Sequence, residues 1–176
     1  MTDLGFDGKV AIITGAGGGL GRQHALMMAA RGALIVVNDL GGSVDGTGSD
    51  KGAAQLVVDE IKAAGGEAVA NTDSVATPDG GENIVQTAVD AFGTVDIVIN
   101  NAGISRAMPF AETTDEIWQE ALDLKLFAAI RLARLAMPQM IGRKWGRIIN
   151  VLNIGAKAPR AASAPTSVTR AAGMAL

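Results

Sequence analysis

The sequence contains no cysteine and no tyrosine among its 176 residues, and His24 is its single histidine. Without cysteine the chain can form no disulfide, no thiolate nucleophile and no cysteine-ligated metal site. Without tyrosine it has no phenol to act as an acid or a base. His24 has no cluster of ligand-type residues around it in the sequence, so we predict no metal site.

Long apolar runs and a strong net charge are also missing. No run reaches the ~18 apolar residues that suggest a membrane-spanning helix, and residues 1–8 are polar and acidic, unlike a signal peptide. The net charge is −3, and the basic residues are scattered along the chain. We therefore expect neither nucleic acid nor a membrane as a partner. The default expectation is a cytoplasmic protein that acts on a small-molecule substrate.

Short β-branched runs alternate with longer amphipathic stretches, which predicts an α/β fold with a Rossmann-like, doubly wound parallel sheet and helices on both faces. The expected strands are Val10–Thr14, 34–37, Glu67–Asn71, 95–99 and 147–151. The expected helices are 20–31, 51–64, 81–92, 114–140 and one that starts after Pro165, and a glycine-rich loop spans 41–49. We expect a single domain over 1–176. Because the chain stops as a helix begins, we expect this domain to lack the last strands of the complete fold.

Glycine dominates the segment 14–21, which lies between the first expected strand and the first expected helix. In a dinucleotide site such glycines allow a sharp turn and a close approach of the backbone to the pyrophosphate. The helix N-terminus then offers amide N–H groups to the phosphates. A glycine-rich run alone can be a flexible loop, but a strand before it and a helix after it favour a cofactor site. The predicted cofactor-binding residues here are Gly15, Gly19, Leu20 and Gly21.

Asp39 ends the second expected strand, about 20 residues beyond the glycine turn, where dinucleotide sites place a carboxylate. A carboxylate accepts hydrogen bonds from free ribose hydroxyls and repels a 2′-phosphate. The predicted cofactor is therefore NAD rather than NADP. Arg22 is a nearby cation that would weaken this preference, and an ordinary solvated aspartate is the alternative interpretation of Asp39.

A second motif, Asn100-Asn101-Ala102-Gly103, directly follows the fourth expected strand. Together with the glycine spacing of the first turn, this motif resembles the short-chain dehydrogenase/reductase family over nearly the whole chain. The resemblance implies a nicotinamide cofactor and the interconversion of a hydroxyl and a carbonyl group. It also implies that Asn100, Ala102 and Gly103 line the adenosine ribose and the crevice of the sheet.

A narrower resemblance covers the first hundred residues. Residues 37–42, 65–71 and 73–75 are similar to the (3R)-hydroxyacyl-CoA dehydrogenase unit of peroxisomal multifunctional β-oxidation enzymes. This similarity implies a 3-hydroxyacyl thioester as the substrate, and it places Asp73 and Ser74 beside the adenine.

The usual catalytic residues of the family are an asparagine, a serine, a tyrosine and a lysine, and the matching positions all carry other residue types. Counted from Trp118 and Gly146, those positions hold Lys125, Asn153, Thr166 and Arg170. A threonine hydroxyl is a far weaker acid than a phenol, and an arginine stays charged and cannot relay a proton. Lys125 can act as an acid if burial lowers its pKa, although a helix lysine more often extends its ammonium group into water.

These residues leave three hypotheses for function. The first is an NAD-dependent oxidoreductase with an atypical catalytic site, in which Lys125, Ser163 or a water supplies the acid. The second is a catalytically silent NAD-binding pseudoenzyme or structural partner subunit, and the third is a fragment of a larger enzyme. In the family the long helix after residue 114 packs across a subunit interface, so the resemblance also implies a homo-oligomer.

Overall fold

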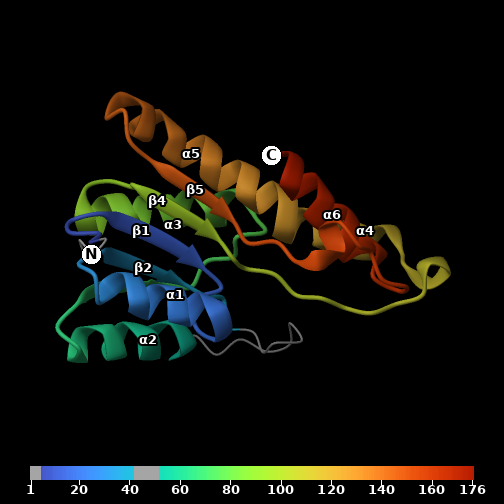
Figure 1. The fold of residues 1–176 in the computed structure, drawn as a ribbon, viewed down its shortest axis with the longest axis horizontal. Helices are drawn as coiled ribbons and strands as arrows, with labels where there is room; N and C mark the ends of the chain where they lie inside the picture. The colour runs from blue at the N-terminus through green and yellow to red at the C-terminus, as the bar shows by residue number, and fades with distance from the viewer. Residues whose placement is uncertain (1–4, 42–51) are drawn as a thin grey trace.

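A computed structural model describes residues 5–41 and 52–176 and shows one five-stranded parallel sheet (Figure 1). The expected loop at 41–49 falls, apart from Gly41, outside the described residues. The strands are β1 (Val10–Thr14), β2 (Leu34–Asn38), β3 (Glu67–Asn71), β4 (Ile97–Asn100) and β5 (Arg147–Asn150). Their order across the sheet is β3-β2-β1-β4-β5, so the chain adds strands on one side of β1 and then reverses to the other side. The predicted fold class is confirmed.

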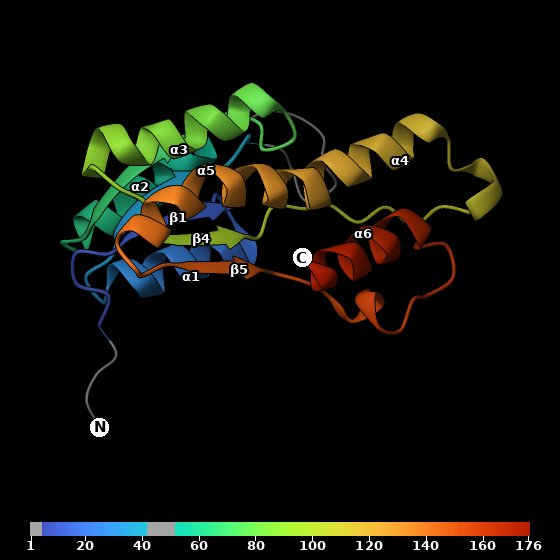
Figure 2. The ribbon, with the colours of Figure 1, turned by 90° about the horizontal axis from the view of Figure 1, so that it is seen from above.

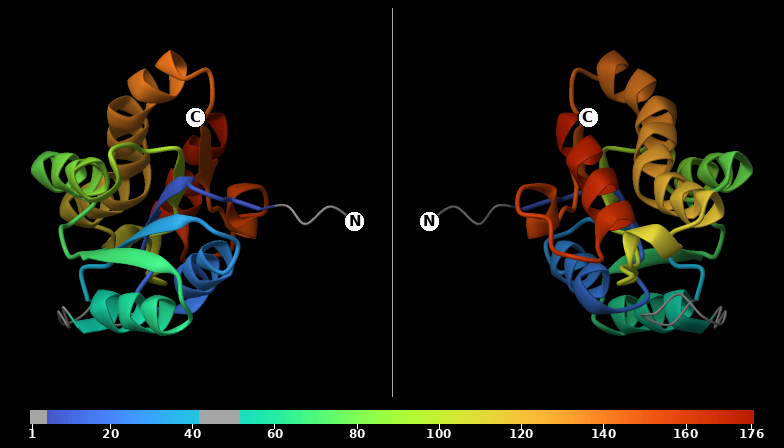
Figure 3. Two further views of the ribbon diagram at one scale, coloured as in Figure 1. Left: turned by 90° about the vertical axis from the view of Figure 1, so that its left-hand side faces the viewer. Right: turned by 90° about the vertical axis from the view of Figure 1, so that its right-hand side faces the viewer.

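Helices cover both faces of this sheet, as the views along its edge show (Figure 3). Helices α1 (Gly19–Ala29) and α2 (Gly52–Ala63) pack on one face, while α3 (Pro78–Phe92) and α5 (Ala128–Gly142) pack on the other. Because successive strand residues point to opposite faces, a strand covered on both sides must be apolar at every position. This requirement explains the uninterrupted apolar run at the start of β1.

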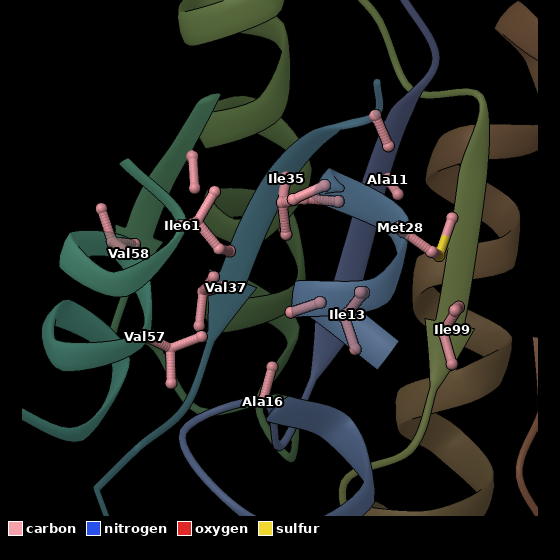
Figure 4. Close-up of a cluster of buried hydrophobic side chains, with 14 of the residues drawn as sticks. Ala11, Ile13, Ala16, Met28, Ile35, Val37, Val57, Val58, Ile61 and Ile99 are labelled. Carbon is pink, nitrogen blue, oxygen red and sulfur yellow. The ribbon is translucent and has the colours of Figure 1, made fainter. Parts of the chain in front are cut away.

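Two apolar clusters fill the two interfaces between sheet and helices. Ala11 and Ile13 of β1 point toward α1 and α2, where they join the cluster shown in Figure 4. Val10 and Ile12 point the other way, into a second cluster that includes Leu132 of α5. All of these side chains are at most 1% exposed. The sheet therefore provides a rigid platform for the loops that follow its strands.

The helical region expected at 114–140 is not one regular helix. It consists of α4 (Asp115–Leu122), a π-helical turn η2 (Asp123–Phe127) and α5. A π-helical turn adds a residue to the repeat and shifts the faces of the helix that follows. Lys125 lies within this turn and is 8% exposed, so the expectation that such a lysine more often extends into water does not hold here.

The last helix, α6 (Ala164–Ala175), lies beyond the carboxyl ends of β4 and β5, close to α4 (Figure 2). It contacts α4, η2 and the short 3₁₀ helix η3 (Ile154–Ala156). The crevice outside the carboxyl ends of parallel strands, at the point where strand order reverses, is where open α/β sheets bind ligands. Here β1 and β4 form that reversal point, and α6 closes one side of it.

Leu132→Ala tests whether α5 holds the second apolar cluster together. The side chain is fully buried, so its truncation should lower the free energy of unfolding by about 2–5 kcal/mol. Leu56→Ala is the matched control, because that leucine is 68% exposed on α2 and should change stability by ~0.5 kcal/mol or less. Denaturant titration of both variants measures the difference. Equal effects at the two positions would contradict this packing.

Candidate cofactor and catalytic site

The turn between β1 and α1 adopts backbone conformations that favour glycine. Gly15 has φ 63° and Gly19 has φ 51°, both in the left-handed region. A Cβ atom at Gly15 would lie 2.9 Å from Ala102 Cα, which is too close for any side chain. A Cβ atom at Gly21 would meet the carbonyl oxygen of Gly15, so the helix can pack under the turn only with glycine there.

The N-terminus of α1 points its first amide groups at the crevice. Its N-cap residue is Gly18, which has no side chain to cap these amides, and its first turn contains no acidic residue. An anion can therefore approach the positive end of the helix dipole without competition from a carboxylate of the helix's own first turn. The exposed side chain of Leu20 lies at the edge of the same crevice.

The carboxyl ends of β1 and β4 are joined by side chains. Thr14 Oγ1 accepts hydrogen bonds from the backbone N–H groups of Asn101 (3.1 Å) and Ala102 (3.0 Å). In return, Asn101 Nδ2 donates to the carbonyl oxygens of Thr14 (2.9 Å) and Gly15 (3.1 Å). Thr14 and Asn101 were not among the predicted site residues, although a polar residue that ends a buried apolar strand was the available signal.

Asp39 directly follows β2 and lines the crevice. Its Oδ2 accepts a hydrogen bond from Gly17 N and its Oδ1 accepts one from Gly41 N, both at 2.8 Å. A carboxylate has about four lone-pair positions, so both oxygens can still accept from ribose hydroxyls. The two hydrogen bonds thus fix the position of this negative charge at the edge of the crevice.

A network of amides fixes the neighbouring wall. Asn38 Nδ2 donates to Asn71 Oδ1 (2.8 Å) and to the Asp73 carbonyl oxygen (2.9 Å). Asn71 Nδ2 donates to Asp73 Oδ2 at 2.8 Å. This network holds Asp73 at the edge of the crevice, which Ser74 also lines. That these two residues lie beside the adenine stays a prediction.

The crevice has a volume of about 550 Å³. The predicted cofactor residues that line it are Gly15, Gly19, Leu20, Asp39, Asp73, Ser74, Ala102 and Gly103. The other two predicted residues lie behind its surface: Gly21 packs under the turn, and Asn100 Nδ2 donates to Asn150 Oδ1 at 2.9 Å. A dinucleotide fits these residues, since glycine backbone, a free helix N-terminus and a fixed carboxylate follow one another along the crevice.

Three of the predicted catalytic positions converge at the opposite end, near β4 and β5. Lys125 Nζ donates to Thr166 Oγ1 at 3.3 Å, and Thr166 is 5% exposed. Arg170 Nη1 donates to the Val151 carbonyl oxygen at 2.8 Å, while its Nη2 lies against Gly103. Helix α6 supplies Thr166 and Arg170, and the π-helical turn η2 supplies Lys125. The three side chains meet because these two elements pack against each other.

Burial and nearby cations control the charge of this group. Burial lowers the pKa of Lys125 from its usual value near 10.5 to about 8, with Arg170 and then Arg106 contributing as like charges. Burial also lowers the pKa of Arg170, which still stays protonated at neutral pH. Lys125 is therefore the group of the three whose charge can change near neutral pH.

Asn153 and Ser163 lie apart from the Lys125 group. Asn153 is exposed, and its Oδ1 accepts from Gly155 N at 3.0 Å, which caps η3. Ser163 Oγ donates to the Arg160 carbonyl oxygen at 2.7 Å and pairs with Ser167 Oγ at 2.8 Å. The structure thus brings Lys125, Thr166 and Arg170 together but not these two candidates.

Lys125 and Thr166 also line an adjoining pocket of about 230 Å³. Its walls are mostly apolar and include Ile104, Met108, Ile117, Ala121, Leu124 and Pro165. Arg106 and Glu120 lie at this pocket as an exposed ion pair, with 3.0 Å between Nη1 and Oε2. The sequence pattern did not predict Arg106 at this pocket, because the position of its side chain depends on the path of the segment after β4.

Some features are absent from the part of the chain that the structure describes. Within residues 5–41 and 52–176, no helix has the length and apolar character needed to cross a membrane. No group of three or more His, Asp or Glu side chains in these residues could hold a metal ion.

Comparison with curated proteins identifies relatives over most of the chain. A peroxisomal hydratase-dehydrogenase-epimerase of Saccharomyces cerevisiae is 53% identical over 84% of this chain and 16% of its own length. A peroxisomal multifunctional enzyme A of Dictyostelium discoideum is 55% identical over 83% of this chain and 32% of its own length. The chain spans only a minor part of both relatives.

Solved structures show the same fold. A short-chain dehydrogenase from Mycobacterium avium has a TM-score of 0.84 and 41% identity, covering 94% of this chain and 59% of that one. A 7α-hydroxysteroid dehydrogenase solved with NADH has a TM-score of 0.87 and 32% identity, covering 96% and 62%. L-Sorbose reductase from Gluconobacter frateurii, solved with NADPH, has a TM-score of 0.88 and 35% identity, covering 98% and 63%. The family model described as short chain dehydrogenase matches residues 9–176, and the chain therefore belongs to the short-chain dehydrogenase family.

Proposed function

We propose that this protein interconverts a hydroxyl and a carbonyl group on a small-molecule substrate with NAD, and that Lys125 carries the proton. The observation behind this proposal is the buried Lys125–Thr166 hydrogen bond between the cofactor crevice and an apolar pocket. When bound, the nicotinamide ring supplies or accepts the hydride. The protein must then deliver a proton to the substrate oxygen during reduction or remove one during oxidation.

NAD is proposed over NADP because of Asp39. The structural relatives were solved with NADH in one case and NADPH in another, so family membership leaves the choice open. In this chain the Asp39 carboxylate is fixed by Gly17 and Gly41. Arg22, the cation that could favour a 2′-phosphate, is already paired with Glu60 at 2.6 Å.

Lys125 takes over the proton transfer that a phenol performs elsewhere in the family. A pKa of about 8 places its ammonium and amine forms near balance at mildly alkaline pH, as acid–base catalysis requires. Thr166 receives one Lys125 hydrogen bond and presents its hydroxyl to the same pocket, so it positions the ammonium group. Arg170 remains cationic against Gly103 and would hold the cofactor rather than transfer a proton.

The proposed substrate is a carbonyl or hydroxyl compound with an apolar body, such as a 3-hydroxyacyl thioester. The adjoining pocket is mostly apolar, which suits a hydrocarbon chain. The thioester is favoured by the resemblance of the first hundred residues and by relatives named a peroxisomal hydratase-dehydrogenase-epimerase and a peroxisomal multifunctional enzyme.

A catalytically silent NAD-binding protein is the second candidate. It is favoured by Asn153, which is exposed and whose side-chain oxygen accepts a hydrogen bond from Gly155 N. The combined variant Lys125→Asn, Asn153→Ser, Thr166→Tyr and Arg170→Lys separates the two. Activity that appears only in this variant would favour the silent protein. Activity in the unmodified chain, on 3-hydroxyacyl thioesters or other secondary alcohols, would favour the enzyme.

The third hypothesis, a fragment of a larger enzyme, is tested by the mass of the native protein.

We also propose a homo-oligomer that forms through the helical region after residue 114. Large apolar side chains are exposed there, namely Phe127 (39%), Met137 (45%) and Ile141 (67%). Light scattering measures the mass of the assembly.

A cytoplasmic location remains the proposal from the sequence, and the relatives named as peroxisomal provide the alternative. Imaging of a fluorescent fusion distinguishes the two compartments.

Asp39→Asn tests the basis of cofactor choice. Removing the negative charge should improve the affinity for NADPH relative to NADH by about tenfold, equivalent to ~1.4 kcal/mol. Fluorescence titration with both cofactors gives the ratio. Asp90→Asn is the control, because Asp90 is an exposed residue of α3 that bonds to Gln86 far from the crevice. An unchanged ratio in Asp39→Asn would show that this carboxylate does not select the cofactor.

Lys125→Met tests the proton-transfer role. Turnover should fall by about 10²–10⁴-fold, because the variant keeps an apolar stem of similar length but has no proton to give. Lys62→Met, an exposed lysine of α2, should retain full activity.

The rates of reduction and oxidation should depend on pH in opposite directions. Reduction needs the ammonium form, so its rate should fall as pH rises through about 8, whereas oxidation needs the amine and should rise over the same range. A Lys125→Met enzyme that keeps both the rate and the pH profile would exclude this role.

A further inference from the structure

Positive charge accumulates beside the redox end of the crevice without a matching carboxylate. Lys125 is 8% exposed, and its hydrogen bond goes to a hydroxyl, Thr166 Oγ1. Arg170 bonds to a backbone carbonyl, and its Nε is buried with no hydrogen-bond partner. Among the described residues, no Asp or Glu forms an ion pair with either side chain. Buried charges without a counter-ion are costly, so the site is sensitive to any further charge.

The strand order determines which part of a dinucleotide meets these cations. Asp39 lies at the end of β2, and the N-terminus of α1 follows β1. A dinucleotide with its adenosine at Asp39 and its pyrophosphate at α1 continues toward β4 and β5. Gly103 follows β4 and lies in contact with Arg170 Nη2, which marks this end of the crevice as the position of the nicotinamide half.

The two redox states of the cofactor differ by one positive charge on the nicotinamide ring. The oxidised ring would add a third positive charge to Lys125 and Arg170 in a poorly solvated site, where charges interact more strongly than in water. The reduced ring adds none. Arginine cannot lose its proton near neutral pH, whereas a buried lysine can.

We propose that the protonation of Lys125 is coupled to the redox state of the bound cofactor, so that NAD⁺ binding expels a proton from Lys125 and NADH binding leaves it in place. The balance is Lys125–NH₃⁺ plus free NAD⁺ giving Lys125–NH₂, bound NAD⁺ and one proton released to solvent. This inference rests on the proposed function, because it requires a nicotinamide cofactor in the crevice. Its consequence is that the ammonium form is retained for reduction, in which a carbonyl needs a proton.

The charged groups that face Lys125 come from three elements. Arg170 lies on α6, Arg106 lies in the segment after β4, and both lower the pKa of Lys125. Glu120 of α4 is the facing acid, but it pairs with Arg106 and its side chain is 63% exposed. Lys125 itself changes charge between pH 6 and pH 9, because its pKa is about 8. A pH dependence of binding in that range therefore reports on Lys125.

Equilibrium binding of NAD⁺ and NADH to the whole protein, measured by calorimetry from pH 6 to pH 9, tests the coupling. We expect the affinity for NAD⁺ to rise by about tenfold across this range, which corresponds to a one-unit shift in the pKa of Lys125 on binding. The affinity for NADH should change by less than twofold. Calorimetry at pH 7 in two buffers of different ionisation enthalpy should show proton release with NAD⁺ and none with NADH.

Two substitutions assign the effect to Lys125. In Lys125→Met the pH dependence should vanish, and NAD⁺ should bind at pH 7 as tightly as it binds the unmodified protein at pH 9. In Lys125→Arg the charge is permanent, so NAD⁺ should bind weakly at every pH. Lys62→Met is the control that should retain the full pH dependence, and thermal unfolding of each variant checks that the fold is preserved.

The outcomes separate this inference from the proposed function. The coupling is wrong if both cofactors bind with the same pH dependence. It is also wrong if NAD⁺ binding to Lys125→Met keeps the pH dependence of the unmodified protein. In both cases cofactor binding itself stands. If neither cofactor binds the unmodified protein, the proposed function fails and the coupling fails with it. A pH dependence of binding that NAD⁺ shows and NADH lacks, and that disappears only in the two Lys125 variants, supports the coupling.

Discussion

The hydroxyl of Thr14 holds together the two strand ends on which the whole site depends. β1 and β4 are neighbours in the sheet, but the chain leaves them in different directions, toward α1 and toward the segment that precedes α4. Thr14 Oγ1 accepts the N–H groups of Asn101 and Ala102 across this gap. Because the gap is closed at its base, the glycine turn and the 101–103 segment form two fixed walls. The crevice between them is the position where open α/β sheets bind ligands.

The two ends of this crevice differ in how closely they follow the family. At the end formed by the glycine turn and Asp39, the close-packed glycine backbone and the fixed carboxylate match the features of dinucleotide sites. At the opposite end, Lys125 and Thr166 are hydrogen-bonded to each other, and by count along the sequence they occupy the positions where the resemblance implies an amide and a phenol. Burying an ammonium group beside Arg170 raises the cost of its charge and so lowers its pKa. The same burial that would be unfavourable in a structural lysine makes this one suited to exchange a proton.

Sequence reasoning recovered the features that depend on local pattern. The strands of the sheet, the helices on both faces and the glycine turn follow from hydrophobic periodicity and from the needs of a tight turn. The π-helical turn at Asp123–Phe127, which packs against α6, could not be predicted from this periodicity, because a regular helix has the same apolar spacing on either side of it. The burial of Lys125 and the proximity of Arg106 depend on that packing as well. Asn153 matched a family position by count, yet the structure uses its side chain to cap η3.

The most direct test of this account is the titration of Lys125 itself. Lysine labelled with carbon-13 at Cε gives a separate signal for each side chain, and the Lys125→Met spectrum identifies the signal of interest. The account predicts that this signal titrates with a pKa of about 8 in the free protein. A value near ~10.4, the ordinary lysine range, would show that Lys125 is solvated and would contradict its role as the proton-bearing group.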